Sequence, residues 1–189
     1  QYRDQQFIAR LKGVEESYLR NWQADSMLLQ GDFYLHREDQ EYALAGQGVN
    51  RALGLSVLDQ QVPLSVFSPR KGVINPANPA EEFNSAAITV SGILGGHEEI
   101  NDLVLVPMSF ARSVLGEYEG LSAVEVHVSG KKNIESLYRE LKIRLGQEGT
   151  DLRILSREEQ NPTLYKIIRS EKWAIFALLT FTGFIAVLN

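Results

Sequence analysis

Residues 101–116, NDLVLVPMSFARSVLG, hold a strand signal and a helix signal side by side. The run from Leu103 to Val106 is apolar without interruption, which is typical of a strand buried on both faces. Pro107 follows this run, and Gly116 follows the next apolar turns. Proline at the first helical position and glycine just after the last are the usual residues at helix ends. The stretch therefore predicts a buried strand and then a helix that begins at Pro107.

The residues that follow predict a strand–helix–strand unit. In SAVEVHVSG, residues 122–130, three valines alternate with polar side chains as in a half-buried strand. Asn133 can cap a helix, and residues 151–156, DLRILS, predict another strand. The expected helix carries an apolar stripe at helical spacing, made of Ile134, Leu137, Leu141 and Leu145. This order predicts an α+β fold, a mixed sheet with helices packed on one face.

Upstream, residues 42–56, YALAGQGVNRALGLS, predict a strand, a tight turn at Gly46 and Gly48, and a short helix. The helix is expected from Gln47 to Leu53, with Gly54 as a left-handed residue after its end. Glycines at a helix start can bind anions. This stretch lacks the Lys-Ser/Thr ending of a phosphate loop and the full dinucleotide spacing, so a tight turn explains it better. Further strands are predicted at residues 7–14, 61–68 and 85–96.

Three of the six prolines, at positions 69, 76 and 79, fall within eleven residues. Neither a helix nor a central strand tolerates that density of proline. Residues 68–84 are therefore predicted to form a long exposed loop or hairpin between two strands.

The chain ends in an apolar helix. Asn161 can cap it, Pro162 can occupy its first position, and no breaker follows until Gly183. From Trp173 to Asn189, 17 residues carry no charge, just under the roughly 20 residues that cross a bilayer. A buried core helix could be equally apolar.

The residues before the apolar run favour a membrane over a core. Trp173 stands where an interfacial aromatic residue would lie. Lys166, Arg169 and Lys172 can extend their charged ends towards lipid headgroups. By the positive-inside tendency this basic cluster favours a cytoplasmic side, although Glu171 offsets one of its charges.

The composition is that of a globular protein. The chain has 189 residues, 44% hydrophobic and 23% charged, with a formal net charge of −5. An acidic balance argues against a nucleic-acid partner. Cysteine is absent, which removes disulfides, thiol catalysis and cysteine-type zinc sites. Because the first residue is Gln1 and no signal segment precedes the folded pattern, we expect a piece of a longer protein, cut at both ends.

Two acidic–histidine clusters contain the residue types of a metal site. HREDQE contains His36, and GHEEIND contains His97. Neither has the two-histidine, one-turn spacing that places ligands and a general base on one helix face. Solvated loop charges explain both clusters better, and His127 is expected on the polar face of a strand. No catalytic elbow or thiol nucleophile is present, so no catalytic residue, metal or cofactor is predicted.

Residues 161–189, NPTLYKIIRSEKWAIFALLTFTGFIAVLN, resemble the segment that leads into the second transmembrane helix of the lipoprotein-releasing (LolC/LolE-type) permeases. In that family a leucine–aromatic pair, a basic residue and a Glu-Lys pair precede an apolar helix that ends near an Asn. The matching residues here are Leu164-Tyr165, Arg169, Glu171-Lys172 and Asn189. EEINDLVLVPMSFARSVLG, AVEVHVSG and EYALAGQGVNRALGLSVLD are similar at the level of pattern, which FtsX-like and MacB-like permeases share. The resemblance extends over residues 7–189.

The resemblance implies a periplasmic domain between the first two of four transmembrane helices of a permease in the bacterial inner membrane. Residues 1–160 would form the MacB-like α+β domain, residues 161–173 a membrane-proximal stalk and residues 174–189 the start of a transmembrane helix. Such permeases are not enzymes. A separate cytoplasmic ATPase drives them together with a partner permease, and lipoproteins pass from the inner membrane to a periplasmic carrier.

In one permease of this family a protruding hook loop binds the carrier. Residues 68–84 stand where that loop would lie. The candidate partner-binding residues are Pro69, Arg70, Val73, Ile74, Asn75, Pro76 and Pro79. The candidate membrane-interface residues, which would contact membrane lipids, are Lys166, Arg169, Lys172 and Trp173.

Three other interpretations stay open. An efflux or cell-division permease of the FtsX-like type has the same architecture, and an adjacent gene for a periplasmic adaptor would favour efflux. A soluble hydrolase or metal enzyme would hold its last helix in a core and bind metal at His36 or His97. A structural or adhesion domain with a single span would lack further apolar segments after Asn189.

Overall fold

The computed structural model describes residues 1–20, 24–59, 61–70, 82–128, 134–147, 152–160 and 162–188. The chain divides into two compact units, Gln1–Glu125 and Val126–Asn189. Each unit is described by itself.

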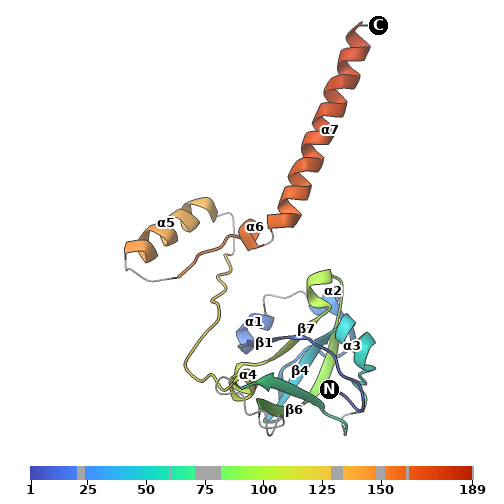
Figure 1. Ribbon diagram of the computed structural model, residues 1–189, viewed down its shortest axis with the longest axis vertical. Coiled ribbons are helices and arrows are strands. Elements are labelled where there is room, and N and C mark those ends of the chain that lie inside the picture. The colour runs from blue at the N-terminus through green and yellow to red at the C-terminus, as the bar shows by residue number, and fades with distance from the viewer. Residues whose placement is uncertain are drawn as a thin grey trace. The chain divides into compact units, whose positions relative to one another are not determined.

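A mixed β-sheet forms the centre of the first unit (Figure 1). Its main path runs β1-β7-β4-β6-β2, while β3 pairs with β4 and β5 pairs with β6. The β1–β7 and β4–β6 pairs are parallel, and the other pairs are antiparallel. The strands are β1 (Arg10–Val14), β2 (Leu28–Gly31), β3 (His36–Arg37), β4 (Gln40–Gly46), β5 (Leu64–Pro69), β6 (Phe83–Leu94) and β7 (Leu103–Pro107). The predicted α+β class with a mixed sheet is confirmed.

The sheet separates two hydrophobic clusters because alternate residues of a strand point to opposite faces. In β7, Val104 and Val106 belong to one cluster, whereas Leu103 and Leu105 belong to the other. The short elements around the sheet are α1 (Glu16–Leu19), α2 (Ala24–Met27), α3 (Gln47–Leu53), η2 (Glu98–Ile100) and α4 (Met108–Leu115).

Helices contribute to both clusters. Helices α3 and α4 supply Val49 and Phe110 to the first cluster. Leu19 of α1 lies in the second, and Met27 of α2 packs against it. Among the described helices of this unit, the expectation of helices on one face holds for α3 and α4 and is wrong for α1 and α2.

The stretch 101–116 folds as a buried strand followed by a helix. All five residues of β7 are buried. The prediction that Pro107 is the first helical residue is wrong by one position. Pro107 is the last residue of β7 and the N-cap of α4. Its ψ of 147° is extended, so the helical backbone begins only at Met108. Gly116 ends α4, as predicted, and its φ of 65° is the left-handed conformation common at helix ends.

The β4–α3 turn is a site of close backbone packing. An added Cβ at Gly46 would lie 1.9 Å from the Ile100 carbonyl oxygen, and one at Gly48 would lie 2.7 Å from the Asn101 oxygen. The Val49 backbone N–H, near the start of α3, donates to the Asn101 oxygen at 3.0 Å. The glycines therefore serve contact with the 100–101 segment, in agreement with a tight turn rather than an anion loop.

We predict that Gly46→Ala lowers the free energy of unfolding by about 3 kcal/mol, because a rigid backbone oxygen cannot move aside. Urea unfolding followed by circular dichroism measures the loss. The control is Gly183→Ala, where an added Cβ meets no atom within 4 Å. Equal stability of Gly46→Ala and the unsubstituted chain would show that the turn is not closely packed.

An ion pair joins β1 to Asp102, the residue before β7. Arg10 donates from Nε to Asp102 Oδ2 at 2.9 Å and from Nη2 to Asp102 Oδ1 at 2.8 Å. Hydrogen bonding from Arg10 lowers the pKa of the Asp102 carboxyl below its ordinary value of 3.8. A carboxylate with a lowered folded-state pKa stabilises the fold above its unfolded pKa, and this contribution is lost as the pH falls through the folded-state value.

Asp102→Asn should therefore flatten the acid side of the stability profile. Because both side chains are exposed, we expect a loss of less than about 1 kcal/mol at neutral pH. Urea midpoints at neutral pH and at a pH below the ordinary carboxylate pKa measure it. Asp4→Asn, at another exposed carboxylate, controls for the lost charge. The same acid dependence in both variants would contradict the role of the Arg10–Asp102 pair.

The described residues of the second unit form the helices α5 (Ile134–Gln147), α6 (Arg157–Gln160) and α7 (Pro162–Leu188). Helices were predicted for α5 and for α7 from Pro162, and both are confirmed. The expected caps Asn133 and Asn161 lie outside the described residues. Tyr138 of α5 donates a hydrogen bond to Glu159 of α6 at 3.0 Å.

Two strand predictions were wrong. Residues 121–128 and 152–156 have no strand structure. Val124 and Val126 are 76% and 66% exposed, so these two valines are not packed into a core. Alternation marks a chain that can pair, but a strand forms only where a sheet edge accepts its backbone hydrogen bonds.

Candidate functional site

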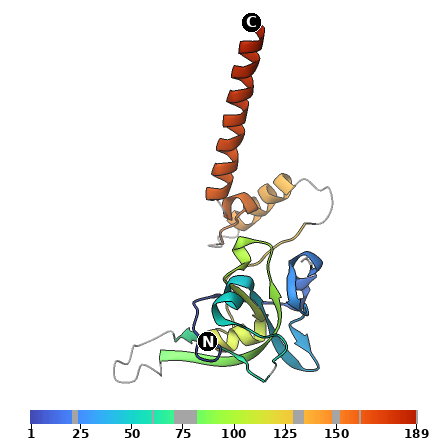
Figure 2. The same ribbon diagram turned by 90° about the vertical axis from the view of Figure 1, so that its right-hand side faces the viewer.

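The β5–β6 hairpin carries the first group of predicted site residues. Only Thr89–Leu94 of β6 pair with β4, whereas Phe83–Ile88 pair with β5. The hairpin consequently extends from the body of the sheet (Figure 2). Residues 68–84 were predicted to form a loop or hairpin, and the two ends of this segment form a hairpin, because Ser68 pairs with Asn84 and Pro69 pairs with Phe83.

Arg70 continues the hairpin beyond the last paired strand residue. Its backbone N–H donates to the Glu82 oxygen at 2.7 Å, and its Nε donates to Asn84 Oδ1 at 2.8 Å. Arg70 thus links the two sides of the hairpin just beyond the Pro69–Phe83 pair. The other predicted loop residues, Val73, Ile74, Asn75, Pro76 and Pro79, lie outside the described residues.

One face of the hairpin exposes aromatic side chains. Leu64 lies in the first hydrophobic cluster and Val66 packs against it, so by alternation Phe67 and Pro69 lie on the opposite face. Phe67 is 51% exposed, and Phe83, directly opposite Pro69, is 44% exposed. We call Phe67, Pro69 and Phe83 the hairpin surface.

Phe67 and Phe83 were not among the residues predicted to bind a partner. The signal was present, because a strand that buries Leu64 and Val66 must turn Phe67 outward.

The outer edge of β5 is partly closed to a further strand. The Gln1 amino group donates to the Ser65 oxygen at 2.6 Å, and the Ser65 backbone N–H donates to the Gln1 oxygen at 2.8 Å. Pro69 has no backbone N–H to offer. Contacts at this hairpin are therefore better made by side chains than by strand addition.

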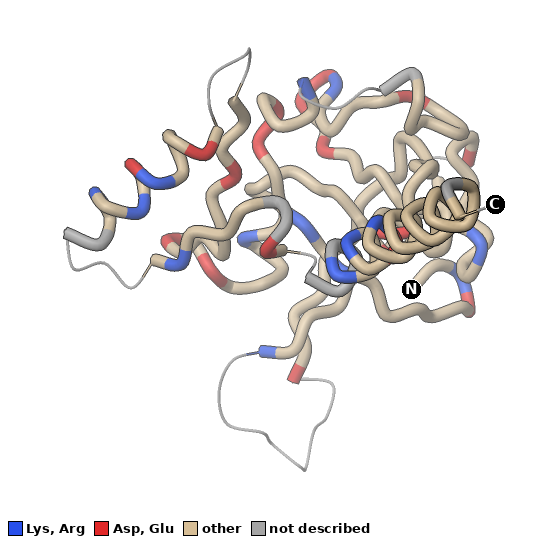
Figure 3. Tube along the Cα trace, turned by 90° about the horizontal axis from the view of Figure 1, so that it is seen from above, with Lys and Arg blue, Asp and Glu red and all other residues tan. Residues whose placement is uncertain are grey.

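The second group of predicted site residues lies in the first half of α7. Lys166, Arg169, Lys172 and Trp173 are all exposed. The Trp173 ring packs edge-to-face against Phe176 with centroids 6.2 Å apart. Seen from above, the basic residues of α7 are confined to its first turns, and the rest of the helix carries no charge (Figure 3).

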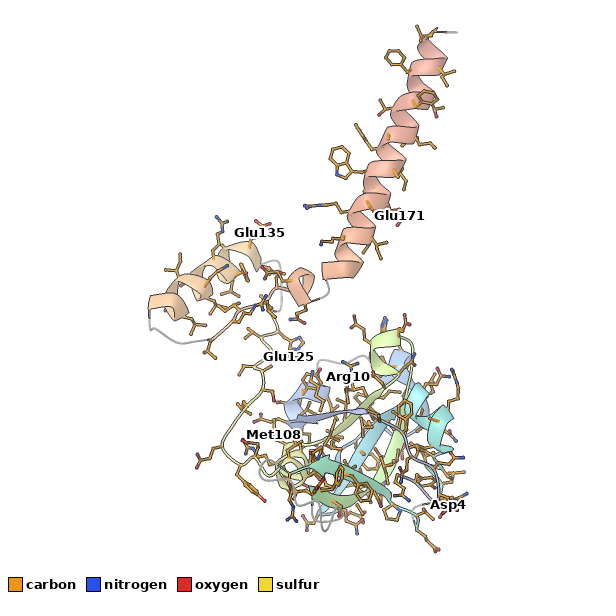
Figure 4. All side chains as sticks on the ribbon, in the orientation of Figure 1. Asp4, Arg10, Met108, Glu125, Glu135 and Glu171 are labelled. Carbon is orange, nitrogen blue, oxygen red and sulfur yellow. The ribbon has the colours of Figure 1, made fainter. Side chains whose placement is uncertain are left out.

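Beyond Trp173, α7 exposes apolar side chains in several directions (Figure 4). The large apolar side chains that are more than half exposed here are Ile175, Phe176, Leu178, Leu179, Phe181, Phe184, Ile185 and Leu188. Thr180 and Thr182 donate their hydroxyl protons to the helix carbonyls of Phe176 and Leu178, both at 2.8 Å. Their polar groups are thereby satisfied within the helix.

Across the described ranges, none of the helices combines the length and the hydrophobicity needed to cross a membrane.

The acidic–histidine clusters do not assemble a metal centre among the described residues, where no group of three suitable ligands comes together. His36 and His97 are both exposed, in β3 and before η2.

A groove of ≈480 Å³ lies near the β3–β4 turn. It is lined by Asp39, Gln40, Glu41, Pro63, Ala87, Ile88, Thr89 and Phe110. Glu41 accepts a hydrogen bond from the Ser109 hydroxyl of α4, which ties this carboxylate to the fold. The groove contains no histidine to act beside its carboxylates.

No model of a known protein family matches this chain, and no curated protein matches it.

Proposed function

We propose that this chain is the periplasmic domain of an ABC-transporter permease of the lipoprotein-releasing type, in the bacterial inner membrane. It would be a mechanical and recognition module without catalysis. A separate cytoplasmic ATPase and a partner permease would act with it to extract lipoproteins from the membrane. The MacB-like assignment of the α+β domain and the start of a transmembrane helix at residue 174 are parts of this proposal.

The observation that carries the proposal is the change of surface character along α7. Three exposed cations and Trp173 precede a segment whose apolar side chains are exposed in several directions. Large contiguous apolar surface is rarely left exposed to water, and where it occurs it usually marks an interaction site. A lipid environment accepts apolar side chains on all sides of a helix. It offers no hydrogen-bond partners to the backbone, but a helix pairs its own backbone N–H and C=O groups.

A helix of this kind can also transmit movement. Helix α7 runs for 27 residues without interruption from Pro162 to Leu188. The cationic first turns and the apolar remainder therefore belong to one continuous element. In the proposed function, a displacement of the apolar half would be carried to the first turns without an intervening hinge.

The hairpin surface is the proposed contact for a periplasmic lipoprotein carrier. Exposed aromatic residues are frequent energetic centres of protein interfaces. The core-facing side of the same hairpin is packed against the first hydrophobic cluster, which holds Phe67 and Phe83 on a fixed support.

We predict that replacing Leu178 and Leu179 with aspartate abolishes flotation of the full chain with lipid vesicles. Aspartate at a bilayer centre costs about 2.5–3.5 kcal/mol per residue on insertion scales. The control replaces Leu58 and Leu121, exposed leucines of the first unit, with aspartate. Flotation that survives the Leu178 and Leu179 substitutions would contradict entry of α7 into the membrane.

We also predict that Phe67→Ser weakens binding of the periplasmic lipoprotein carrier by at least tenfold in a calorimetric titration, as expected for an aromatic interface centre. Aspartate at both Val73 and Ile74 tests the connecting segment in the same assay. Tyr118→Ser, at an aromatic residue that is 67% exposed, is the matched control. Unchanged affinity in both hairpin variants would remove the carrier site.

A further inference from the structure

The positive charges of α7 lie on one side of the helix. Lys166, Arg169 and Lys172 follow one another at three-residue intervals. At about 100° per residue they fall within an arc of about 120°, which also contains Trp173. Glu171 lies nearly opposite, about 160° from the middle of this arc. Figure 4 labels Glu171 on the right-hand side of α7. We call Lys166, Arg169 and Lys172 the basic face.

The charges of the basic face are available for binding. All three side chains are exposed. Within the described part of the chain, no carboxylate forms an ion pair with any of them. Glu171 stands two and five residues from Arg169 and Lys166, spacings at which side chains on a helix do not meet.

The basic face matches the depth of a headgroup layer. The helix rises 1.5 Å per residue, so Lys166 lies about 10 Å from Trp173 and Lys172 is adjacent to it. Headgroups add roughly 5–8 Å on each side of the hydrocarbon core. Long lysine and arginine side chains extend several ångströms along the helix, so all three charges can reach this layer while the residues after Trp173 lie in hydrocarbon.

We propose that the basic face binds the phosphate groups of anionic phospholipids at the membrane surface. This proposal rests on the proposed entry of α7 into the membrane. Arginine offers a planar fork of donors for phosphate oxygens, and the two lysines act as flexible point charges. A zwitterionic headgroup carries its own ammonium beside the phosphate. Net attraction therefore favours anionic lipids.

The test uses the full chain with Trp22→Phe, which leaves Trp173 as its one tryptophan. Binding is titrated by Trp173 fluorescence, with vesicles of phosphatidylcholine alone and vesicles in which phosphatidylglycerol replaces a third of it. At about fivefold per cation, we expect tighter binding to the anionic vesicles on the order of a hundredfold at low salt. Glutamine at all three positions of the basic face should abolish this preference, and high salt should reduce it.

The control replaces Arg139, Lys142 and Arg144, three exposed cations of α5, with glutamine and removes the same charge. Circular dichroism checks that both triple variants keep their helix content. An equal loss of lipid preference in both variants would overturn the basic face as the binding surface.

Two further outcomes separate this proposal from the one on which it rests. Equal blue shifts of Trp173 in both kinds of vesicle would overturn anionic-lipid binding and leave membrane entry standing. If neither kind of vesicle shifts the Trp173 emission, both proposals fail.

Discussion

Burial of β7 on both faces is the constraint on which the first unit depends. Every backbone N–H and C=O of a buried strand needs a partner, and β1 and β4 supply these on its two sides. Apolar side chains on both faces also need cover. The alternation in β7 therefore requires two hydrophobic clusters, with α3 and α4 contributing to one and α1 to the other.

Strand β6 connects this core to the hairpin. Its second half lies in the sheet, where Ser91, the one buried polar residue among those described, donates its hydroxyl proton to the Tyr34 oxygen at 2.7 Å. The Ala43 oxygen of β4 lies 3.2 Å from the same hydroxyl. Its first half pairs with β5 and carries Phe83. Phe83 of the hairpin surface thus lies on the outer part of a strand whose inner part is held in the core.

The second unit depends on a different physical principle. A helix satisfies its own backbone hydrogen bonds, so α7 needs no sheet edge and its apolar side chains need not converge on a core. Its exposed apolar residues and the basic face belong to one element. In the proposed function, the membrane around α7 and not a protein core would therefore determine what this helix does.

Between Lys12 and Glu125 the structure adds an interaction that no local pattern indicates. Glu125, the last residue of the first unit, pairs with Lys12 of β1, and Lys12 also donates to the Tyr18 hydroxyl at 2.8 Å. Burial alone would lower the pKa of Lys12, but hydrogen bonds to Glu125 and Tyr18 raise it. Residues far apart in sequence make this contact, so only the folded chain could reveal it.

The amino-acid sequence by itself determined the elements whose signals are local. The β7–α4 stretch, the turn at Gly46 and the start of α7 at Pro162 each depend on propensities and end residues within a few positions. The shared side of Lys166, Arg169 and Lys172 on α7 also follows from the sequence, because three-residue spacing keeps side chains on one side of a helix. Tertiary structure alone decided which alternating segments became strands: 64–69 found a partner in β6, whereas 121–128 found none. It also set the register that places Phe83 opposite Pro69, on the same face as Phe67. The physical reason is that a helix closes its hydrogen bonds within one segment, whereas a strand depends on a second segment that its own residues do not specify.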